Sequence, residues 1–368
     1  MLILIPLFLS LAALAFAELP RFREHVLATD LRGGYQVVVA DVNGDGKPDL
    51  IALASGMTEL VWFENPGRER IQGSWQRHVI AGNLNRMINC AFERIDGKPV
   101  IVLASEFNND ASKSIGIVSV LTPGADILAP WTVREIDRIP TSHRIRTAVV
   151  GAQTVFINAV LTDSTARPPE FRGHAPLVLY RPGVWKREPI GSEEEGVMHG
   201  IWIEGPDQFL AASFSGIHRY HFAKGAWSRT EISKGDPGAW PKGGSSDVTE
   251  DRDWIAAIEP WHGNQVAVYD RHGKHRQIID ISLVDGHTIL TADLNGDGKK
   301  EIIAGYRGKG TSVLLFERVK GVWVKTVLDS AIAAAACAAA DFNGDGRMDI
   351  ACIGSSTTNL KWYESLGR

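Results

Sequence analysis

The segment Asp41-Val42-Asn43-Gly44-Asp45-Gly46-Lys47-Pro48-Asp49 occurs three times, in closely similar form, in this sequence of 368 residues. The two further copies span residues 293–301 and 341–349. Each copy lies between two short apolar runs, as in VVVA at 37–40 and LIAL at 50–53, and an aromatic run follows. Short apolar strands that alternate with glycine-containing turns predict an all-β structure built from repeated sets of strands.

A fourth strand of each repeat is marked by an aromatic or histidine residue, followed by basic and β-branched residues. Six copies occur at 75–80, 131–136, 185–188, 227–232, 275–279 and 323–327. A seventh copy at 22–27 has no strands before it, whereas the last repeat ends after its third strand. The N-terminal strand can therefore complete the last sheet, which leaves no open edge. We predict a seven-bladed β-propeller of four-stranded blades, with residues 18–368 as one domain.

The first seventeen residues form a separate segment that carries no charged side chain and ends in Ala15-Phe16-Ala17. The apolar run is short for a membrane span, and small residues stand where a signal peptidase reads the chain. We predict a cleaved signal peptide at 1–17, with a retained anchor as the alternative. The expected location is secreted or periplasmic, with no membrane association after cleavage.

The net charge argues against nucleic-acid binding, and the cysteine count argues against a disulfide framework. The sequence holds 39 basic and 43 acidic residues, so its net charge of −4 provides no field that would attract nucleic acid. Its three cysteines are too few for a disulfide framework. We expect buried free thiols, and a cross-strand bridge between Cys337 and Cys352 is the alternative.

The three acidic loops have the composition of cation sites. Carboxylate and amide oxygens at alternate positions, with glycine to bend the chain, suit a hard cation such as calcium. We expect structural Ca²⁺ in the first, sixth and seventh blades. The expected ligands, in which Lys47, Lys299 and Arg347 contribute carbonyl groups, are Asp41, Asn43, Asp45, Lys47, Asp49, Asp293, Asn295, Asp297, Lys299, Glu301, Asp341, Asn343, Asp345, Arg347 and Asp349.

Four of the eleven histidines map to the mouth of the central channel, on the face opposite these loops: His143, His199, His262 and His287. Six further residues map to the same face: Arg86, Glu106, Arg144, Arg146, Tyr306 and Arg307. Glu259 stands three positions before His262. Imidazoles suit zinc binding or acid–base chemistry near neutral pH, and arginines suit an anionic or enolate-like charge. We therefore expect a functional site there. The structural alternative is a set of histidines that serve only the turns.

The acidic loops resemble those of the FG-GAP or VCBS repeat family, whose members are seven-bladed propellers. The segments at 143–146, 198–201, 258–263 and 285–287 resemble the propeller domain of aldos-2-ulose dehydratases, and the Glu-Pro-Trp-His-Gly stretch at 259–263 is the most specific of them. That resemblance implies a carbon–oxygen lyase that removes water from keto-sugars such as 1,5-anhydrofructose, with catalytic zinc in the propeller.

The roles of the candidate site residues follow as a hypothesis. His143 would be the base, His199, His262 and His287 would hold zinc, and Glu259 would orient a ligand or act as an acid. Arg144, Arg146, Tyr306 and Arg307 would complete the site, and the division of roles among the histidines stays open. The expected partner is a small sugar or a glycan. The alternatives are an isomerase, a polysaccharide lyase that acts on uronic-acid glycans, and a non-catalytic, calcium-stabilised propeller that binds glycan or protein.

Overall fold

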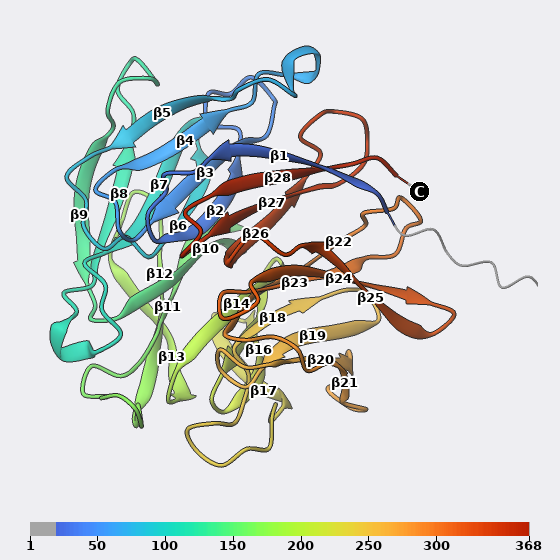
Figure 1. The fold of residues 1–368 in the computed structure, drawn as a ribbon. Coiled ribbons are helices and arrows are strands. Elements are labelled where there is room, and N and C mark those ends of the chain that lie inside the picture. Colours follow the sequence, from blue (N-terminus) through green and yellow to red (C-terminus); the bar gives the residue numbers. More distant parts are fainter. Residues whose placement is uncertain (1–19, 368) are drawn as a thin grey trace, which may run out of the picture.

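The computed structural model describes residues 20–367, and its strands form seven four-stranded antiparallel sheets (Figure 1). The predicted signal peptide at 1–17 lies outside the described residues. Blade one contains β2 (Gly34–Ala40), β3 (Asp49–Ala54), β4 (Leu60–Glu64) and β5 (Gln76–Ala81), and blade two contains β6 (Asn89–Ile95), β7 (Lys98–Ser105), β8 (Ile117–Thr122) and β9 (Thr132–Arg138). Blade three contains β10 (Ser142–Val150), β11 (Gln153–Val160), β12 (His174–Tyr180) and β13 (Arg187–Glu195), and blade four contains β14 (Met198–Gly205), β15 (Gln208–Ser213), β16 (Gly216–Ala223) and β17 (Ala226–Ser233).

The remaining blades follow the same order. Blade five contains β18 (Asp247–Glu250), β19 (Trp254–Glu259), β20 (Gln265–Asp270) and β21 (Gln277–Asp280). Blade six contains β22 (Gly286–Ala292), β23 (Glu301–Tyr306), β24 (Ser312–Val319) and β25 (Val322–Asp329), and blade seven contains β26 (Ala334–Ala340), β27 (Asp349–Gly354) and β28 (Leu360–Ser365). Two single-turn 3-10 helices, η1 (Arg68–Arg70) and η2 (Ala111–Lys113), complete the elements, and no helix of the described part is long and apolar enough to cross a membrane.

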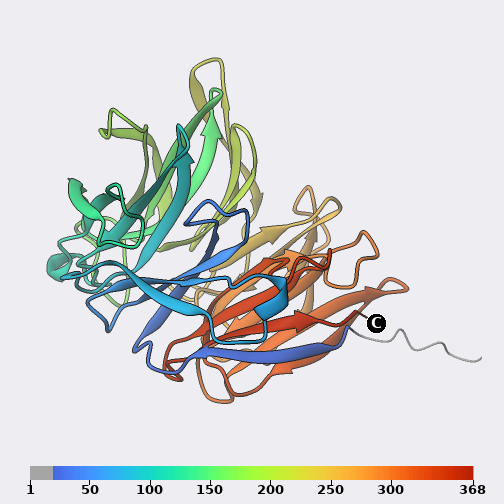
Figure 2. The ribbon, with the colours of Figure 1, turned by 90° about the horizontal axis from the view of Figure 1, so that it is seen from above.

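The N-terminal strand β1 (Phe22–Ala28) closes the ring as predicted. It pairs antiparallel with β28, from Phe22 opposite Ser365 to Ala28 opposite Leu360. In both views β1 and β28 lie side by side in this last blade (Figures 1 and 2). The prediction of a seven-bladed propeller closed by its N-terminal strand is confirmed.

Burial differs from strand to strand within a blade. The second strands β3, β19, β23 and β27 are buried at every position, which explains why their sequences read as continuous apolar runs. The outer strand β25 is exposed or partly buried at every position except its last residue, Asp329. Apolar clusters form where neighbouring blades meet, as with Trp62 of blade one and Ile101 of blade two. The core therefore runs around the ring between the blades.

Tyrosine and a basic residue bind the same carboxylate at three blade-to-blade contacts. Each carboxylate lies on the fourth strand of one blade, and its two partners lie on the next blade. Glu194 of β13, for example, accepts hydrogen bonds from Tyr220 Oη at 3.0 Å and Arg229 Nε at 2.9 Å. Asp137 binds Tyr180 and Arg187 in the same way, and Asp329 binds Tyr363 and Lys361. These contacts connect successive blades.

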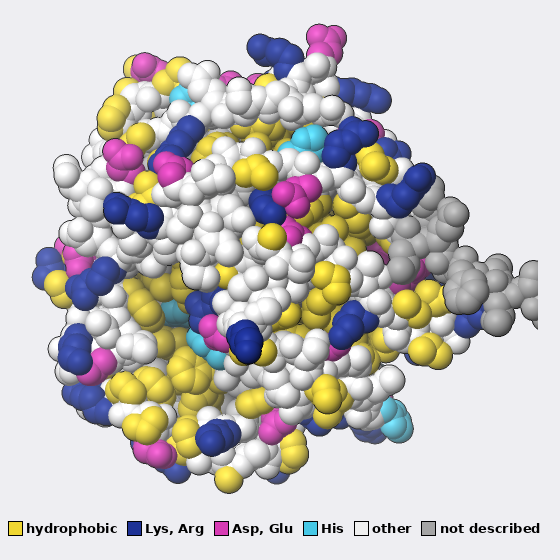
Figure 3. Space-filling model, viewed as in Figure 1, with side chains coloured by type: hydrophobic (Ala, Val, Ile, Leu, Met, Phe, Trp, Pro, Cys, Tyr) yellow, Lys and Arg dark blue, Asp and Glu magenta, His cyan; other side chains and the backbone are white. Residues whose placement is uncertain are grey.

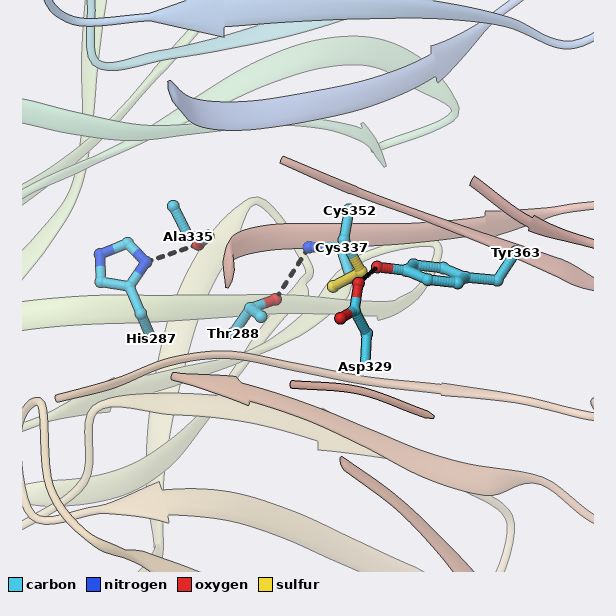
Figure 4. Close-up of a disulfide and its surroundings, with 7 residues drawn as sticks. All are labelled: His287, Thr288, Asp329, Ala335, Cys337, Cys352 and Tyr363. Atoms are coloured by element: carbon cyan, nitrogen blue, oxygen red, sulfur yellow. Dashed lines mark hydrogen bonds between the residues drawn. A yellow bond between two sulfur atoms is a disulfide. The ribbon is translucent and has the colours of Figure 1, made fainter. Parts of the chain in front are cut away.

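The structure contradicts the expectation that all three cysteines are free thiols. Cys337 and Cys352 lie directly opposite each other on β26 and β27 and form a disulfide, with 4.1 Å between their Cα atoms (Figure 4). The sequence placed both residues on strands on either side of one turn, but it did not give the register that brings the two side chains together. Cys90 is a buried free thiol, as expected.

Candidate functional site

The first strands of five blades carry a register shift at the same place, close to the channel mouth. The residues at the shift are Tyr35, His143, His199, His287 and Ala335, in blades one, three, four, six and seven. A bulge adds a residue to one strand of a pair and changes the direction of its side chain. Because the acidic loops follow the opposite ends of β2, β22 and β26, the bulges and the loops lie on opposite faces of the ring.

Blade five contributes its histidine in a different way. His262 lies in the turn between β19 and β20, with φ of 49°, in the left-handed region. Its backbone N–H donates to Ser246 Oγ at 3.2 Å, which fixes the turn to the start of the blade. The turn therefore brings an imidazole to the same mouth that the bulged histidines line.

His199, His262 and His287 form one close group of potential metal ligands. One ring nitrogen of each lies within 4.8 Å of the others, and the Nε2 atoms of His199 and His262 are 3.3 Å apart. No other group of three or more His, Cys, Asp or Glu side chains gathers this closely within residues 20–367. The three residues are those predicted from the sequence as zinc ligands, and zinc itself stays a prediction.

Hydrogen bonds determine which ring nitrogen of His262 and of His287 keeps a lone pair. His287 Nδ1 lies 2.5 Å from the carbonyl oxygen of Ala335, and His262 Nδ1 lies 2.9 Å from Asp285 Oδ1 (Figure 4 shows the His287 contact). A carbonyl or carboxylate oxygen can only accept, so each Nδ1 carries the hydrogen and each neutral ring keeps a lone pair on Nε2. His287 Nε2 is buried and has no hydrogen-bond partner. An unpartnered, buried lone pair beside two further imidazoles fits a metal ion bound by three histidines.

Asp285 is the carboxylate that orients His262. It also accepts hydrogen bonds from Arg307 Nε and a terminal nitrogen of Arg307, both at 3.1 Å. Burial raises the pKa of Asp285, but hydrogen bonds from His262 and Arg307 and the charge of Arg307 lower it more, to about 2. The group is thus an anion at neutral pH. A carboxylate on the remote nitrogen of a histidine is the usual partner of a metal-bound imidazole.

Burial keeps the histidines neutral. It lowers the pKa of His143, His199 and His287 well below the usual value, and the charges of Arg144 or Arg307 lower it further. The pKa of His262 is also lowered, mainly by burial. Neutral imidazoles can bind a metal or accept a proton, whereas imidazolium can do neither.

His143 lies beside the three-histidine group and pairs with a tyrosine. Its Nε2 is 2.8 Å from Tyr35 Oη, and its ring centroid is 5.0 Å from that of His199. Arg144 is buried, donates from Nε to the carbonyl oxygen of His199 at 2.9 Å, and places a terminal nitrogen 3.3 Å from His199 Nε2. The mouth thus combines an acid–base pair, a guanidinium group and three imidazole lone pairs.

The other residues predicted for the site lie differently. Glu259 is buried and binds Tyr269 and Arg276 of its own blade and Ser245 just before that blade, and it does not contact His262 as we expected. Tyr306 packs in an apolar cluster and donates from Oη to the carbonyl of Gly310 at 2.9 Å. Arg146 lines the central channel and donates to Asn89 Oδ1 at 2.9 Å. Burial lowers the pKa of Arg146 to about 10.

Three residues of the mouth were missed as site residues. Tyr35 carries no motif, and only the bulge that it shares with the histidines reveals its role. Asp247 opens blade five and lines the channel, and its pKa is raised, mainly by burial. Asp285 stands two residues before His287, and that spacing was the one signal that could have identified it.

Figure 3 shows histidine side chains at the bottom of a hollow in the region of β13 and β14, with hydrophobic side chains beside them. A cavity of about 670 Å³, lined by His287, Arg144 and residues of the first strands, continues along the channel. The site is therefore reached from the face where the bulges lie.

The three acidic loops adopt one conformation. In each, the first Asp and the Asn accept hydrogen bonds from backbone N–H groups within the loop, as Asp41 does from Gly44 at 2.8 Å. The last acidic residue of each loop is buried, and burial is the main cause that raises the pKa of Asp49, Glu301 and Asp349 to about 7. Asp45 pairs with Lys47, and Asp345 pairs with Arg347. Calcium in these loops stays a prediction.

Comparison with known proteins agrees with the fold and its repeats. Family models of the FG-GAP repeat and the FG-GAP-like repeat match residues 33–57 and 293–352. In solved structures, a chain from "Crystal structure of BBS1N in complex with ARL6DN, soaked with mercury" is similar with a TM-score of 0.60 and 13% identity over 93% of this chain and 95% of that one. The "Dos1 propeller" is similar with a TM-score of 0.54 and 10% identity over 87% and 76%. The chain is thus a seven-bladed β-propeller with FG-GAP repeats.

Within that class, one more specific similarity is found. Residues 115–272 match the family model "Aldos-2-ulose dehydratase, beta-propeller domain". The aldos-2-ulose dehydratase of Phanerodontia chrysosporium is 24% identical over 306 residues, which cover 68% of this chain and 33% of that protein. The chain spans about a third of the length of this relative. The resemblance recognised from the sequence is confirmed, and it supports a carbohydrate-related propeller domain.

Proposed function

We propose that this protein is a carbon–oxygen lyase that removes water from a keto-sugar. The observation that carries the proposal is the convergence of three imidazole lone pairs beside the Tyr35–His143 pair. The similarity to a dehydratase propeller over residues 115–272 supports the same reaction class.

His199, His262 and His287 are the residues that would hold a zinc ion. When bound, zinc would supply a Lewis acid that polarises the sugar carbonyl. Arg144 and Arg307 would also stabilise negative charge on the carbonyl oxygen, because they place positive charge where an enolate-like oxygen would lie. His262 keeps its direction through Asp285, and His287 keeps its direction through Ala335.

Elimination beside a carbonyl needs a base for the acidic C–H and an acid for the departing hydroxyl. Neutral His143 can accept the proton, and the hydroxyl of Tyr35, 2.8 Å from Nε2, can pass a proton to the departing oxygen. One proton then leaves carbon and one returns to oxygen, the carbon–oxygen bond breaks, and water and an enone are the products. The base and acid act as a pair.

A spectroscopic screen tests the proposal. Purified, zinc-loaded protein is incubated with keto-sugars, including 1,5-anhydrofructose, and with uronate glycans, and the ultraviolet absorbance of an enone is followed. We expect absorbance from a keto-sugar, and we expect Tyr35→Phe and His143→Gln to lose it while they retain zinc. Absorbance from uronates alone would favour a polysaccharide lyase, and no product from any sugar would favour a binding module.

Export to an oxidising compartment forms part of the proposal. The charge-free segment at 1–17 motivates it, and the Cys337–Cys352 disulfide supports it, because such bonds persist outside the reducing cytosol. N-terminal sequencing of mature protein from the native host would test it, with Glu18 expected as the first residue. An intact Met1 would contradict it.

A further inference from the structure

A second cavity opens beside the histidine site, and the proposed reaction does not use it. We call it the aromatic groove and define it by Pro169, Phe171, Phe214, Pro241, Trp261 and Val284, which line a volume of about 660 Å³. His262 and Asp285 also belong to its wall. The groove and the site therefore share a boundary, and a molecule bound at the histidines can extend into the groove.

The loops that form the groove hold one another in place. Trp261 packs edge-on against Phe171, with 5.6 Å between ring centroids, and lies 5.5 Å from Phe214. Phe214 also packs against Trp240, whose indole N–H donates to the carbonyl of Glu170 at 2.8 Å and whose ring lies under Arg172. These contacts join the loop after β11, the turn after β15 and the segment between β17 and β18. The groove is thus formed before any ligand binds, which lowers the entropic cost of binding.

The chemistry of the wall restricts its occupant. Its polar members at the rim are Asn109, Lys242 and Asn264. Lys242 is the one basic side chain besides His262 among its lining residues, and the one acidic side chain, Asp285, is already bound by His262 and Arg307. A polyanionic chain of uronates would need several cations here. Aromatic side chains with few charges instead suit a neutral ring with an apolar face.

Trp261 connects the groove to the site. Its ring centroid is 4.7 Å from that of His262, and its indole N–H is buried without a hydrogen-bond partner. A ring that packs on Trp261 would lie next to a sugar bound at the three histidines, and a glycosidic bond is short enough to join the two. We propose that the substrate is a glycoside of a keto-sugar whose neutral second ring, aryl or glycosyl, lies in the aromatic groove. This inference rests on the proposed function for the identity of the sugar in the site.

Equilibrium binding of unreactive glycosides tests the inference without any turnover. Methyl β-D-glucoside, phenyl β-D-glucoside and methyl β-cellobioside are titrated into the zinc-loaded full-length protein by calorimetry. We expect the phenyl or the cellobiosyl ligand to bind about tenfold more tightly than the methyl glucoside, which is an effect of about 1.4 kcal/mol. The ligand that binds more tightly identifies the second ring as aryl or glycosyl. Equal affinities, or no binding by any of the three, would overturn the inference.

Variants show whether the preference for a second ring depends on the aromatic groove. Trp261→Ala should abolish the preference for a second ring, and Asn264→Trp should reduce it by filling the groove from its rim without removing core contacts. Trp227→Ala is the matched control, because this tryptophan packs on Phe209 and Phe222 in blade four, and it should leave the preference unchanged. A preference that survives in both groove variants would overturn the inference. Because no ketone is present, these results do not depend on whether the elimination occurs.

Discussion

The Asp285→Asn substitution tests whether the carboxylate of Asp285 makes His262 a stronger metal ligand. The carboxylate lies 2.9 Å from His262 Nδ1 and is held by two hydrogen bonds from Arg307. Because the pKa of Asp285 is about 2, the wild-type group is charged throughout the pH range of any practical assay. Asparagine keeps the size of the side chain but removes the charge that makes the imidazole a stronger ligand. Loss of such a partner weakens metal affinity by roughly tenfold to a hundredfold, or about 1.4 to 2.7 kcal/mol.

Zinc affinity is measured at pH 7.5 by competition with a chromophoric chelator, and the melting temperature is recorded in parallel. Asp253→Asn, at an exposed position in the turn between β18 and β19, is the control and should bind zinc like the wild type. An Asp285→Asn variant that folds normally and binds zinc as tightly as the wild type would show that Asp285 does not strengthen metal binding. A variant that loses affinity without a change in melting temperature would support it.

Further predictions concern stability. Burial raises the pKa of Glu194, but hydrogen bonds from His218, Arg229 and Ser213 lower it more, to about 2. The ionised carboxylate therefore stabilises the folded state above pH 4.5, and this stabilisation is lost as the pH falls through about 2. Glu194→Gln should therefore lower the free energy of unfolding by about 3 kcal/mol at pH 7, and this difference from the wild type should shrink between pH 5 and pH 2. Glu193→Gln, at an exposed position, should leave the free energy of unfolding unchanged at every pH. Urea titrations at several pH values measure both effects. Added calcium should raise the melting temperature of the wild type and raise that of Asp345→Ala less, because a ligand that binds only the folded form stabilises it; no response in the wild type would argue against occupied loops. Reduction of the Cys337–Cys352 bond, which closes a separation of 15 residues, should lower stability by about 3 kcal/mol in denaturant titrations, and an unchanged midpoint would contradict that.

The number of blades and their closure could be predicted because both follow from local patterns that repeat. Seven outer strands with a shared aromatic–basic pattern, one of them displaced to the N-terminus, leave one arrangement without an open edge. The same mapping placed His143, His199, His262 and His287 on one face. In an antiparallel blade the start of the first strand and the end of the second strand lie on the same face, and these histidines stand at those positions.

The partners of these residues could not be predicted, because they depend on register and side-chain direction. A one-residue bulge decides that Tyr35 faces His143, and no residue type marks a bulge in this sequence. Glu259 stands three residues from His262, yet its side chain turns into the blade toward Arg276, while Asp285 reaches His262 from the next blade. The Cys337–Cys352 disulfide depends in the same way on a register that the sequence leaves open.

We propose that His199, His262 and His287 bind one zinc ion through their Nε2 atoms. X-ray absorption at the zinc edge of the purified, zinc-loaded protein measures this most directly, because it reports the type and distance of the ligand atoms. We expect three imidazole nitrogens at about 2.0–2.1 Å with an additional light atom, and loss of this signal in His262→Ala. A shell of oxygen ligands alone, or an unchanged spectrum in His262→Ala, would contradict it.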